Sequence, residues 1–163
     1  MKIYLASDHA GYELKNALVE YVRALGHDVE DCGAHVFDAD DDYPEIIARA
    51  ARKLSADSIA GKGSRAIVIG ASGQGEAMVA NRFRGVRCAL YYGKAGEQKD
   101  MSGKELDMIA SVRGHNSANA LSLGARFITE GEAKKAVEKW LKTDFSGQER
   151  HARRIKQIDE ITG

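Results

Sequence analysis

The chain has 163 residues, which is the size of one compact domain able to bury a continuous core. Lys plus Arg and Asp plus Glu each number 24, so no overall positive field favours nucleic acid and no polybasic run favours a membrane surface. With two cysteines, no signal-peptide h-region and no apolar run near the roughly 18 residues of a membrane helix, we expect a soluble cytoplasmic protein.

The first part of the chain alternates between strand and helix patterns. Met1 to Ala6 is a short apolar run that predicts a strand, and apolar residues at helical spacing between Gly11 and Leu25 predict a helix. His27 to Cys32 alternates like a second strand. Pro44 stands where it can open the next helix, because the first helical turn does not need the amide hydrogen that proline lacks.

The same alternation continues through the middle of the chain. Ala66 to Ile69 predicts a third strand, and Gly73 and Gly75 lead into a short helix. Apolar runs at residues 86–91 and 120–123 predict the fourth and fifth strands. Strands that are apolar almost throughout and alternate with helices are typical of a parallel sheet covered on both faces. We therefore predict an α/β, Rossmann-like three-layer αβα fold with a five-stranded parallel sheet and a C-terminal helical extension.

Two segments do not fit this simple alternation. Residues 93–114 are polar and long for a connection, so the segment is either a helix-containing excursion or a mobile flap. After a predicted helix at residues 132–142, residues 147–161 are basic and offer little apolar surface to bury against their own domain. We predict a single domain, residues 1–163, in which residues 144–163 pack on a partner subunit.

Polar loops follow the first and third predicted strands. Ser7 to Gly11 reads SDHAG, and Gly70 to Glu76 reads GASGQGE. In open parallel sheets, ligands bind beyond the carboxyl ends of the strands, so both loops lie on the expected binding edge. A glycine-rich turn that enters a helix exposes backbone N–H groups to an anion. Such turns also arise merely to let a helix pack close to a strand, and the pattern alone leaves both interpretations open.

Each acid or base candidate has a structural alternative. Glu76 is either a general base or an acid that complements the dipole of a first helical turn. Asp8 either takes part in the chemistry or caps the first helix, and His9 is either functional or a structural hydrogen-bonding group. His115 and Asn116 add a second acid or base and an amide able to hold a hydroxyl group.

The cationic candidates are three arginines. Arg126 follows the fifth predicted strand, and Arg150 and Arg154 are four residues apart, which places them on one face if that segment is helical. Two guanidinium groups in that arrangement can grip a phosphate bidentately. The alternative is a solvated basic face on a terminal helix.

Six segments are highly specific in combination: SDHAGYELK at residues 7–15, DYP at 42–44, IGASGQGEAMVANR at 69–82, GVRCAL at 85–90, HNSANALSLGAR at 115–126 and ERHARRI at 149–155. Together they resemble the ribose-5-phosphate isomerase B family, which also includes galactose-6-phosphate isomerase subunits, nearly from end to end. The resemblance implies an isomerase that works through a cis-enediolate without metal or cofactor. It also implies a homodimer, alone or paired into a dimer of dimers, with sites built across the interface.

The resemblance assigns the chemistry to four residues. Glu76 matches the base of the family's glutamate branch and would move a proton between C1 and C2 of the open-chain sugar. The other branch uses a cysteine, and the matching position here is Gly70. His115 would open the furanose ring as an acid with Asp8 as its complementary base, and Ser72 would lie beside the reacting carbons.

The same resemblance assigns substrate binding to a larger set. Asn116 and the loop amides would stabilise the enediolate oxygens, His9 and the three arginines would hold the phosphate, and Tyr43 would line the sugar pocket. The full substrate-binding set is Asp8, His9, Tyr43, Ala71, Ser72, Gly73, Gln74, Gly75, Asn116, Arg126, Arg150 and Arg154.

Other functions remain open from the sequence. The same residues would serve a six-carbon substrate such as galactose 6-phosphate or allose 6-phosphate, and residues 93–114 are longer than in shorter members of that family. A non-catalytic sugar-phosphate or nucleotide sensor would keep the arginines and the glycine loop but would need no carboxylate base. A dinucleotide enzyme is disfavoured, because SDHAGYE lacks the first two glycines of the expected fingerprint.

Overall fold

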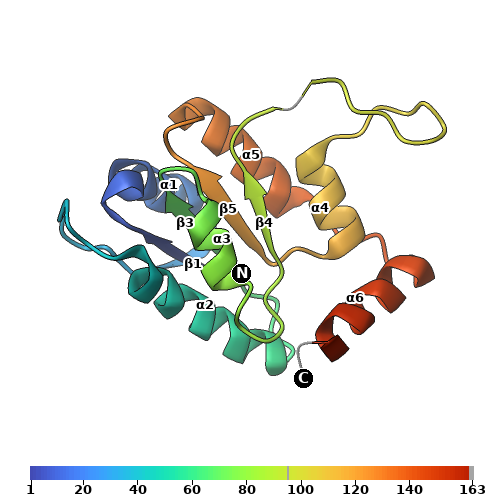
Figure 1. Ribbon diagram of the computed structural model, residues 1–163, viewed down its shortest axis with the longest axis horizontal. Coiled ribbons are helices and arrows are strands. Elements are labelled where there is room, and N and C mark those ends of the chain that lie inside the picture. Colours follow the sequence, from blue (N-terminus) through green and yellow to red (C-terminus); the bar gives the residue numbers. More distant parts are fainter. Residues whose placement is uncertain (95, 162–163) are drawn as a thin grey trace.

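One parallel sheet with the strand order β2-β1-β3-β5-β4 forms the centre of the computed structural model, which describes residues 1–94 and 96–161 (Figure 1). The strands are β1 (Lys2–Ser7), β2 (Asp28–Asp31), β3 (Arg65–Gly70), β4 (Cys88–Tyr91) and β5 (Ala120–Gly124). β3 is buried along its whole length, and so is β5. The predicted fold class is confirmed, and the apolar strands are explained by burial on both faces.

Helices cover the two faces of the sheet, which gives three layers (Figure 1). In chain order they are η1 (His9–Gly11), a 3-10 turn, and the α-helices α1 (Tyr12–Ala24), α2 (Tyr43–Ile59), α3 (Gln74–Ala80), α4 (Met108–Asn116), α5 (Glu130–Lys142) and α6 (Glu149–Ile161). The core on one face contains Leu18 of α1 and Trp140 of α5, and the core on the other contains Ile47 of α2 and Ala80 of α3. Each face therefore has its own apolar layer.

The connection between β4 and β5 contains a helix, so the excursion interpretation of residues 93–114 holds for the residues that are described. Asp107 caps α4 by accepting a hydrogen bond from the amide of Ala110. Before α4, an isolated antiparallel bridge joins Lys99 to Glu105, and the turn extends away from the sheet (Figure 1). Residue 95 of this segment lies outside the described residues. The 3-10 turn of residues 9–11 was not predicted.

The C-terminal helix α6 lies beyond α4, at the periphery of the molecule (Figure 1). His151 is its fully buried residue and stacks on His115 of α4 with ring centroids 4.5 Å apart. Asp159 forms an ion pair with Arg87 at 3.7 Å. Residues 162–163 of the predicted partner-binding segment lie outside the described residues. Across residues 1–94 and 96–161, no helix has both the length and the apolar character required to cross a bilayer.

Candidate active site

The crevice beyond the carboxyl ends of β1 and β3 is the switch point of the sheet. The chain leaves β1 for β2 on one side, whereas after β3 it continues to β4 and β5 on the other. Ser7 pairs with Ile69 in the register of these strands, so the loops that follow them begin side by side. Ligands of open parallel sheets bind at such a point because the connections diverge there. The two polar loops predicted from the sequence therefore meet.

The glycine loop, residues 70–75, is tied to β5 and to the turn that follows β5. The buried Ser122 donates a 2.6 Å hydrogen bond from Oγ to the carbonyl of Gly73. The amide of Arg126 donates to the carbonyl of Ala71 at 3.0 Å, which brings Arg126 to the crevice. Ser122 was missed by sequence reasoning, although a serine inside the apolar strand ALSLG is a usable signal. These hydrogen bonds to β5 and to the turn after it hold the glycine loop in place.

Glu76 is the buried acid of the crevice, only 4% exposed in the first turn of α3. Its carboxylate lies against the Cα of Gly70, where an added Cβ would collide with it. Burial raises the pKa of Glu76; its own backbone amide opposes the rise and the negative charge of Asp8 adds to it. A carboxylate with a raised pKa is a stronger proton acceptor. The Glu76 carboxylate therefore occupies the space that a side chain at position 70 would need.

Tyr43 packs against the glycine loop, of which Ser72 is a member. The Tyr43 ring packs on Gly75, where a Cβ would lie 2.6 Å from the ring carbon Cζ. Ser72 is half-buried, and its Oγ accepts a long hydrogen bond of 3.4 Å from the amide of Gln74. Gly73 has φ 76°, a left-handed conformation that suits glycine. The predicted loop residues therefore share one wall of the crevice.

Asp8 and His9 follow β1 and face the same crevice. Asp8 caps the 3-10 turn, because its Oδ1 accepts the amides of Ala10 and Gly11 at 3.0 and 3.2 Å. His9 Nδ1 lies 2.7 Å from Asp41 Oδ1. The hydrogen bond to Asp41 raises the pKa of His9 above its ordinary value. Asp8 thus caps the 3-10 turn that leads into α1 rather than α1 itself, and its role in the chemistry stays a prediction. Asp41 is a neighbour of His9 that the sequence did not single out. We call residues 8–9, 43, 71–76 and 126 the carboxyl-end cluster.

Ligand atoms of Asp8, His9 and Asp41 lie within 4.8 Å of one another, which is a spacing that a metal ion can use. The expectation of no metal, which came from the family resemblance, did not anticipate this grouping. His9 Nδ1 and Asp41 Oδ1 are nevertheless bonded to each other, and Asp8 Oδ1 accepts the backbone amides of Ala10 and Gly11. A metal would have to break these bonds, so metal independence stays our prediction.

The remaining predicted residues lie on the side of the sheet where the strands begin. His115 and Asn116 end α4 just before β5 begins, whereas Glu76 follows the end of β3. Parallel strands of five residues span roughly 17 Å, so one chain keeps His115 about a strand length from Glu76. His115 stacks on His151, which accepts a 3.2 Å hydrogen bond from Arg150 Nε. We call His115, Asn116, Arg150, His151 and Arg154 the α4–α6 cluster.

His151 is the member of the α4–α6 cluster that sequence reasoning missed. Its Nδ1 lies 2.8 Å from Ser146 Oγ, and it is only 4% exposed. Burial lowers the pKa of His151, and the neighbouring charges of His115, Arg150 and Arg154 lower it further. The contact with Arg150 is compatible with this direction, because Arg150 Nε donates to His151 Nε2, which can accept only when it carries no proton. His151 therefore joins the end of α4 to the arginine face of α6.

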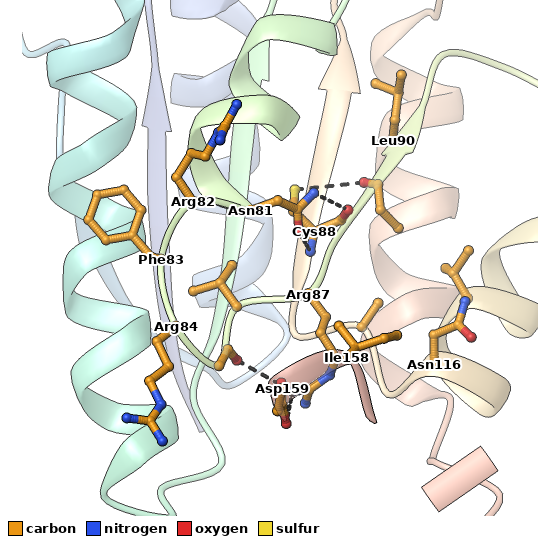
Figure 2. A pocket seen from close by; sticks show the side chains of 15 residues that line it. Asn81, Arg82, Phe83, Arg84, Arg87, Cys88, Leu90, Asn116, Ile158 and Asp159 are labelled. Atoms are coloured by element: carbon orange, nitrogen blue, oxygen red, sulfur yellow. Dashed lines mark hydrogen bonds and ion pairs between the residues drawn. The ribbon is translucent and has the colours of Figure 1, made fainter. Parts of the chain in front are cut away.

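A groove of about 580 Å³ lies between residues 81–90 and parts of α4 and α6, and Asn116 is the residue of the α4–α6 cluster in its lining (Figure 2). Figure 2 shows Asn116 and Ile158 on the side of the groove that lies across from Asn81 and Cys88. Asn81 fixes its own wall by exchanging hydrogen bonds of 3.0 and 2.8 Å with the backbone of Cys88. The groove runs beside β4, which is one of the two edge strands of the sheet. Edge strands expose unpaired backbone groups and are usually covered by another surface.

The two cysteines are not candidates for the base. Burial raises the pKa of Cys32 to about 11 and that of Cys88 to about 12, with the charge of Glu76 adding to the rise at Cys88. Thiols with such pKa values stay protonated at neutral pH and are poor nucleophiles. Cys32 is a buried core residue, whereas Cys88 is half-buried and lines the groove.

The chain is similar to known proteins over almost its whole length. The family model described as Ribose/Galactose Isomerase matches residues 3–158. Ribose-5-phosphate isomerase B of Mycobacterium tuberculosis is 40% identical over 160 residues, which cover 98% of this chain and 89% of that protein. The probable ribose-5-phosphate isomerase B of Mycoplasma genitalium is 36% identical over 156 residues, covering 96% and 92%.

Solved structures give the same result for the fold. The crystal structure of ribose-5-phosphate isomerase B from Mycoplasma genitalium with bound ribulose-5-phosphate has a TM-score of 0.84 and 35% identity, covering 98% of this chain and 95% of that chain. The ribose-5-phosphate isomerase B structure from Clostridium thermocellum has a TM-score of 0.82 and 34% identity, covering 99% and 97%.

Proposed function

The chain belongs to the ribose/galactose isomerase family, and from this we propose that it interconverts ribose 5-phosphate and ribulose 5-phosphate through a cis-enediolate with Glu76 as the base. It is a sugar-phosphate isomerase, as its relatives are named. The relative from Mycoplasma genitalium was solved with ribulose-5-phosphate bound, which supports the five-carbon substrate. We place the reaction in the cytoplasm.

The buried Glu76 carboxylate beside the glycine loop is the observation that carries this proposal. Removing a proton next to a carbonyl requires a base, worth about 10²- to 10⁴-fold, and donors for the oxyanion, each worth roughly 2.7–4 kcal/mol. Glu76 is the base, and the raised pKa strengthens it. The amides of residues 71–75, with Ser72 beside the reacting carbons, are the donors. A sensor that only bound the sugar phosphate would have no use for a buried carboxylate here.

Ring opening needs an acid, and in this scheme it is His115, with Asp8 as the complementary base and Asn116 holding an enediolate oxygen. One chain keeps His115 near the amino ends of the strands and Glu76 near the carboxyl ends. A second copy must therefore bring His115 and Asn116 to the crevice. We assign the groove beside β4 to that second copy, which gives a homodimer with two shared sites.

The phosphate end of the site combines cations from both copies. His9 and Arg126 lie in the carboxyl-end cluster of one chain, and Arg126 is close enough for its charge to oppose the protonation of His9. Arg150 and Arg154 are one turn apart on α6, so their guanidinium groups can hold two phosphate oxygens each. Tyr43 lines the sugar between the two ends. Residues 144–163 would thus reach the partner.

An isomerase assay on a panel of aldose phosphates tests the proposal. Ribose 5-phosphate should turn over faster than galactose 6-phosphate or allose 6-phosphate, and in D2O the aldose should acquire deuterium at C2. Turnover is the deciding measurement, because an enclosed base can return its own proton without exchange. Preference for a six-carbon substrate would replace ribose 5-phosphate as the assigned substrate. Binding of all three sugar phosphates without turnover would support a non-catalytic sugar-phosphate sensor.

A further inference from the structure

Asp41 holds His9 by two bonds to a single carboxylate oxygen. Asp41 Oδ1 accepts the backbone amide of His9 at 3.1 Å and lies 2.7 Å from His9 Nδ1. The shorter distance is typical of a charge-assisted hydrogen bond. Main chain and ring are fixed by the same acceptor, so the imidazole has little freedom to rotate. The edge of Phe37 packs against the same ring, with centroids 6.4 Å apart.

The loop before α2 is shaped to aim this one carboxylate. Asp38 forms a turn in which its Oδ1 accepts the amide of Asp40 at 3.0 Å and its carbonyl accepts the amide of Asp41 at 3.2 Å. Asp38, Asp40 and Asp42 are exposed, whereas the Asp41 side chain is only 11% exposed. Among four acids within five residues, Asp41 is therefore the one turned toward the crevice.

The hydrogen bond decides which atom of His9 is left for a ligand. Because Nδ1 is engaged by Asp41, Nε2 is the nitrogen that remains available. In the neutral ring with a proton on Nδ1, Nε2 carries a lone pair and would repel a phosphate oxygen. In the cationic ring, Nε2 carries a proton and donates to phosphate. The Asp41 contact is useful to a phosphate site only if it also keeps His9 protonated.

The charges around His9 favour the protonated ring. Asp41 raises the pKa of His9 most, and Asp8 also raises it, whereas partial burial and the charge of Arg126 lower it. Asp41 Oδ2 is buried and has no hydrogen bond within residues 1–94 and 96–161. A buried carboxylate is stable only beside a positive charge, and His9 is in direct contact with it. The anion and the cation therefore support each other.

We propose that Asp41 is a positioning residue for phosphate recognition, which orients His9 and holds it as the cation that donates from Nε2 to the substrate phosphate. This inference rests on the proposed function, in which His9 binds the phosphate. The cation exists below the pKa of His9 and is lost as pH rises through it. Phosphate affinity should therefore fall as pH rises, and removal of the Asp41 charge should move that fall to lower pH.

The test compares Asp41→Asn with Asp40→Asn, which removes the same charge from the neighbouring exposed position. The probe is ribitol 5-phosphate, which has no carbonyl and cannot be isomerised, with ribitol as the control for the sugar alone. At about pH 8, Asp41→Asn should bind ribitol 5-phosphate about tenfold more weakly, because without the Asp41 charge the pKa of His9 falls and a smaller share of the ring is cationic at that pH. Asp40→Asn should bind it as the wild type does.

Two further measurements separate positioning from general damage. NMR titration of the His9 ring should give a lower pKa in Asp41→Asn than in wild type or Asp40→Asn. With ribose 5-phosphate, Asp41→Asn should raise KM and leave kcat within about twofold, since a uniform binding interaction is lost. Asp41→Glu keeps the carboxylate, so it should bind ribitol 5-phosphate at high pH more tightly than Asp41→Asn does. If Asp41→Asn does not fold, Asp41→Glu is compared with wild type instead.

The outcomes distinguish this inference from the proposed function. If wild type binds ribitol 5-phosphate but does not turn over ribose 5-phosphate, the isomerase assignment fails. The role of Asp41 is then still tested by comparing the affinities of wild type, Asp41→Asn and Asp40→Asn for ribitol 5-phosphate. If wild type turns over and the His9 titration and the pH dependence of affinity are the same in all three proteins, Asp41 has no positioning role. Equal losses in Asp40→Asn and Asp41→Asn would also overturn it, because they would reflect charge at a distance.

Discussion

The carboxyl-end cluster and the α4–α6 cluster differ in how the fold holds them. In the first, Gly73 is fixed by the buried Ser122 and Glu76 fits against Gly70 without room for another atom. Nearby, buried Lys15 pairs with Asp31 at 2.5 Å. In the second, α6 is joined to the body by the stacked histidines and by a half-exposed ion pair of 3.7 Å between Arg87 and Asp159.

This difference shows where preorganisation comes from in each half. The residues assigned to proton transfer depend on contacts within the core of one chain, so folding alone positions them. His115, the proposed ring-opening acid, and the phosphate-binding Arg150 and Arg154 lie on α4 and α6, which each bury one residue. In the proposed homodimer, assembly would position them. We expect substitutions in the first cluster to act on every chain independently and those in the second to act across the interface.

The largest effect is expected at Glu76. Glu76→Gln should reduce turnover of ribose 5-phosphate by at least 10²-fold and leave binding within about tenfold, because the amide keeps the shape but cannot accept the proton. The measurements are steady-state kinetics and the affinity for ribitol 5-phosphate. Glu45→Gln is the matched control, since Glu45 is also a first-turn acid but is exposed on α2. Retained turnover in Glu76→Gln would place the base elsewhere.

The second prediction concerns sharing of the site between copies. Glu76→Gln and His115→Ala should each be inactive alone, yet mixing them after reversible dissociation should restore about one quarter of wild-type activity. The reason is that half of the randomly formed dimers are mixed, and each mixed dimer has one site with both changes and one with neither. Activity is measured after heterodimers have been verified by native mass spectrometry.

Two controls accompany the mixing experiment. Wild type taken through the same dissociation must recover its activity, and Glu76→Gln remixed with itself must stay inactive. If heterodimers form and activity does not return, each site is built within one chain. His115 would then be a structural partner of His151 rather than the ring-opening acid.

The third prediction compares one ion pair from each region. Lys15→Met should lower the free energy of unfolding by about 3 kcal/mol, because it leaves the Asp31 carboxylate without its buried partner. Asp159→Asn should lower it by less than about 1 kcal/mol, since the Arg87–Asp159 pair is partly exposed. Urea unfolding of both variants gives the two values. Equal losses would mean that α6 is held as firmly as the sheet.

Much of the fold was predictable because strand and helix patterns report burial directly. The apolar run at β3 and the helical spacing in α1 correspond to elements that are buried as those patterns require. The pattern failed for residues 93–114, where polar sequence conceals α4, whose buried residue is Ile109. A short helix with one buried residue leaves almost no periodic signal, so both interpretations of that segment stayed open.

The site was predictable only where neighbours in the chain are also neighbours in space. The loops after β1 and β3 could be placed side by side, because ligands of parallel sheets bind beyond the carboxyl ends of the strands. The structure brings Asp8 and Glu76 close enough for an electrostatic interaction. Asp41 could not be linked to His9, because the contact spans 32 residues of loop, helix and strand. Ser122 and His151 also make long-range contacts, with Gly73 and His115, although the serine within the apolar strand ALSLG was a signal for the first. Long-range contacts of polar side chains have no periodicity to reveal them.

The smallest expected effect is that of metal removal, and it tests whether the carboxyl-end cluster acts through its side chains alone. EDTA should leave turnover unchanged, because in the group of potential ligands formed by Asp8, His9 and Asp41, His9 Nδ1 is bonded to Asp41 Oδ1 and Asp8 Oδ1 accepts backbone amides. Activity is compared before and after dialysis against EDTA and after addition of divalent metal ions. Loss with rescue by one metal would refute the prediction and would favour a hydride shift over the enediolate. Loss without rescue would indicate damage to the protein, which the unfolding curve would detect.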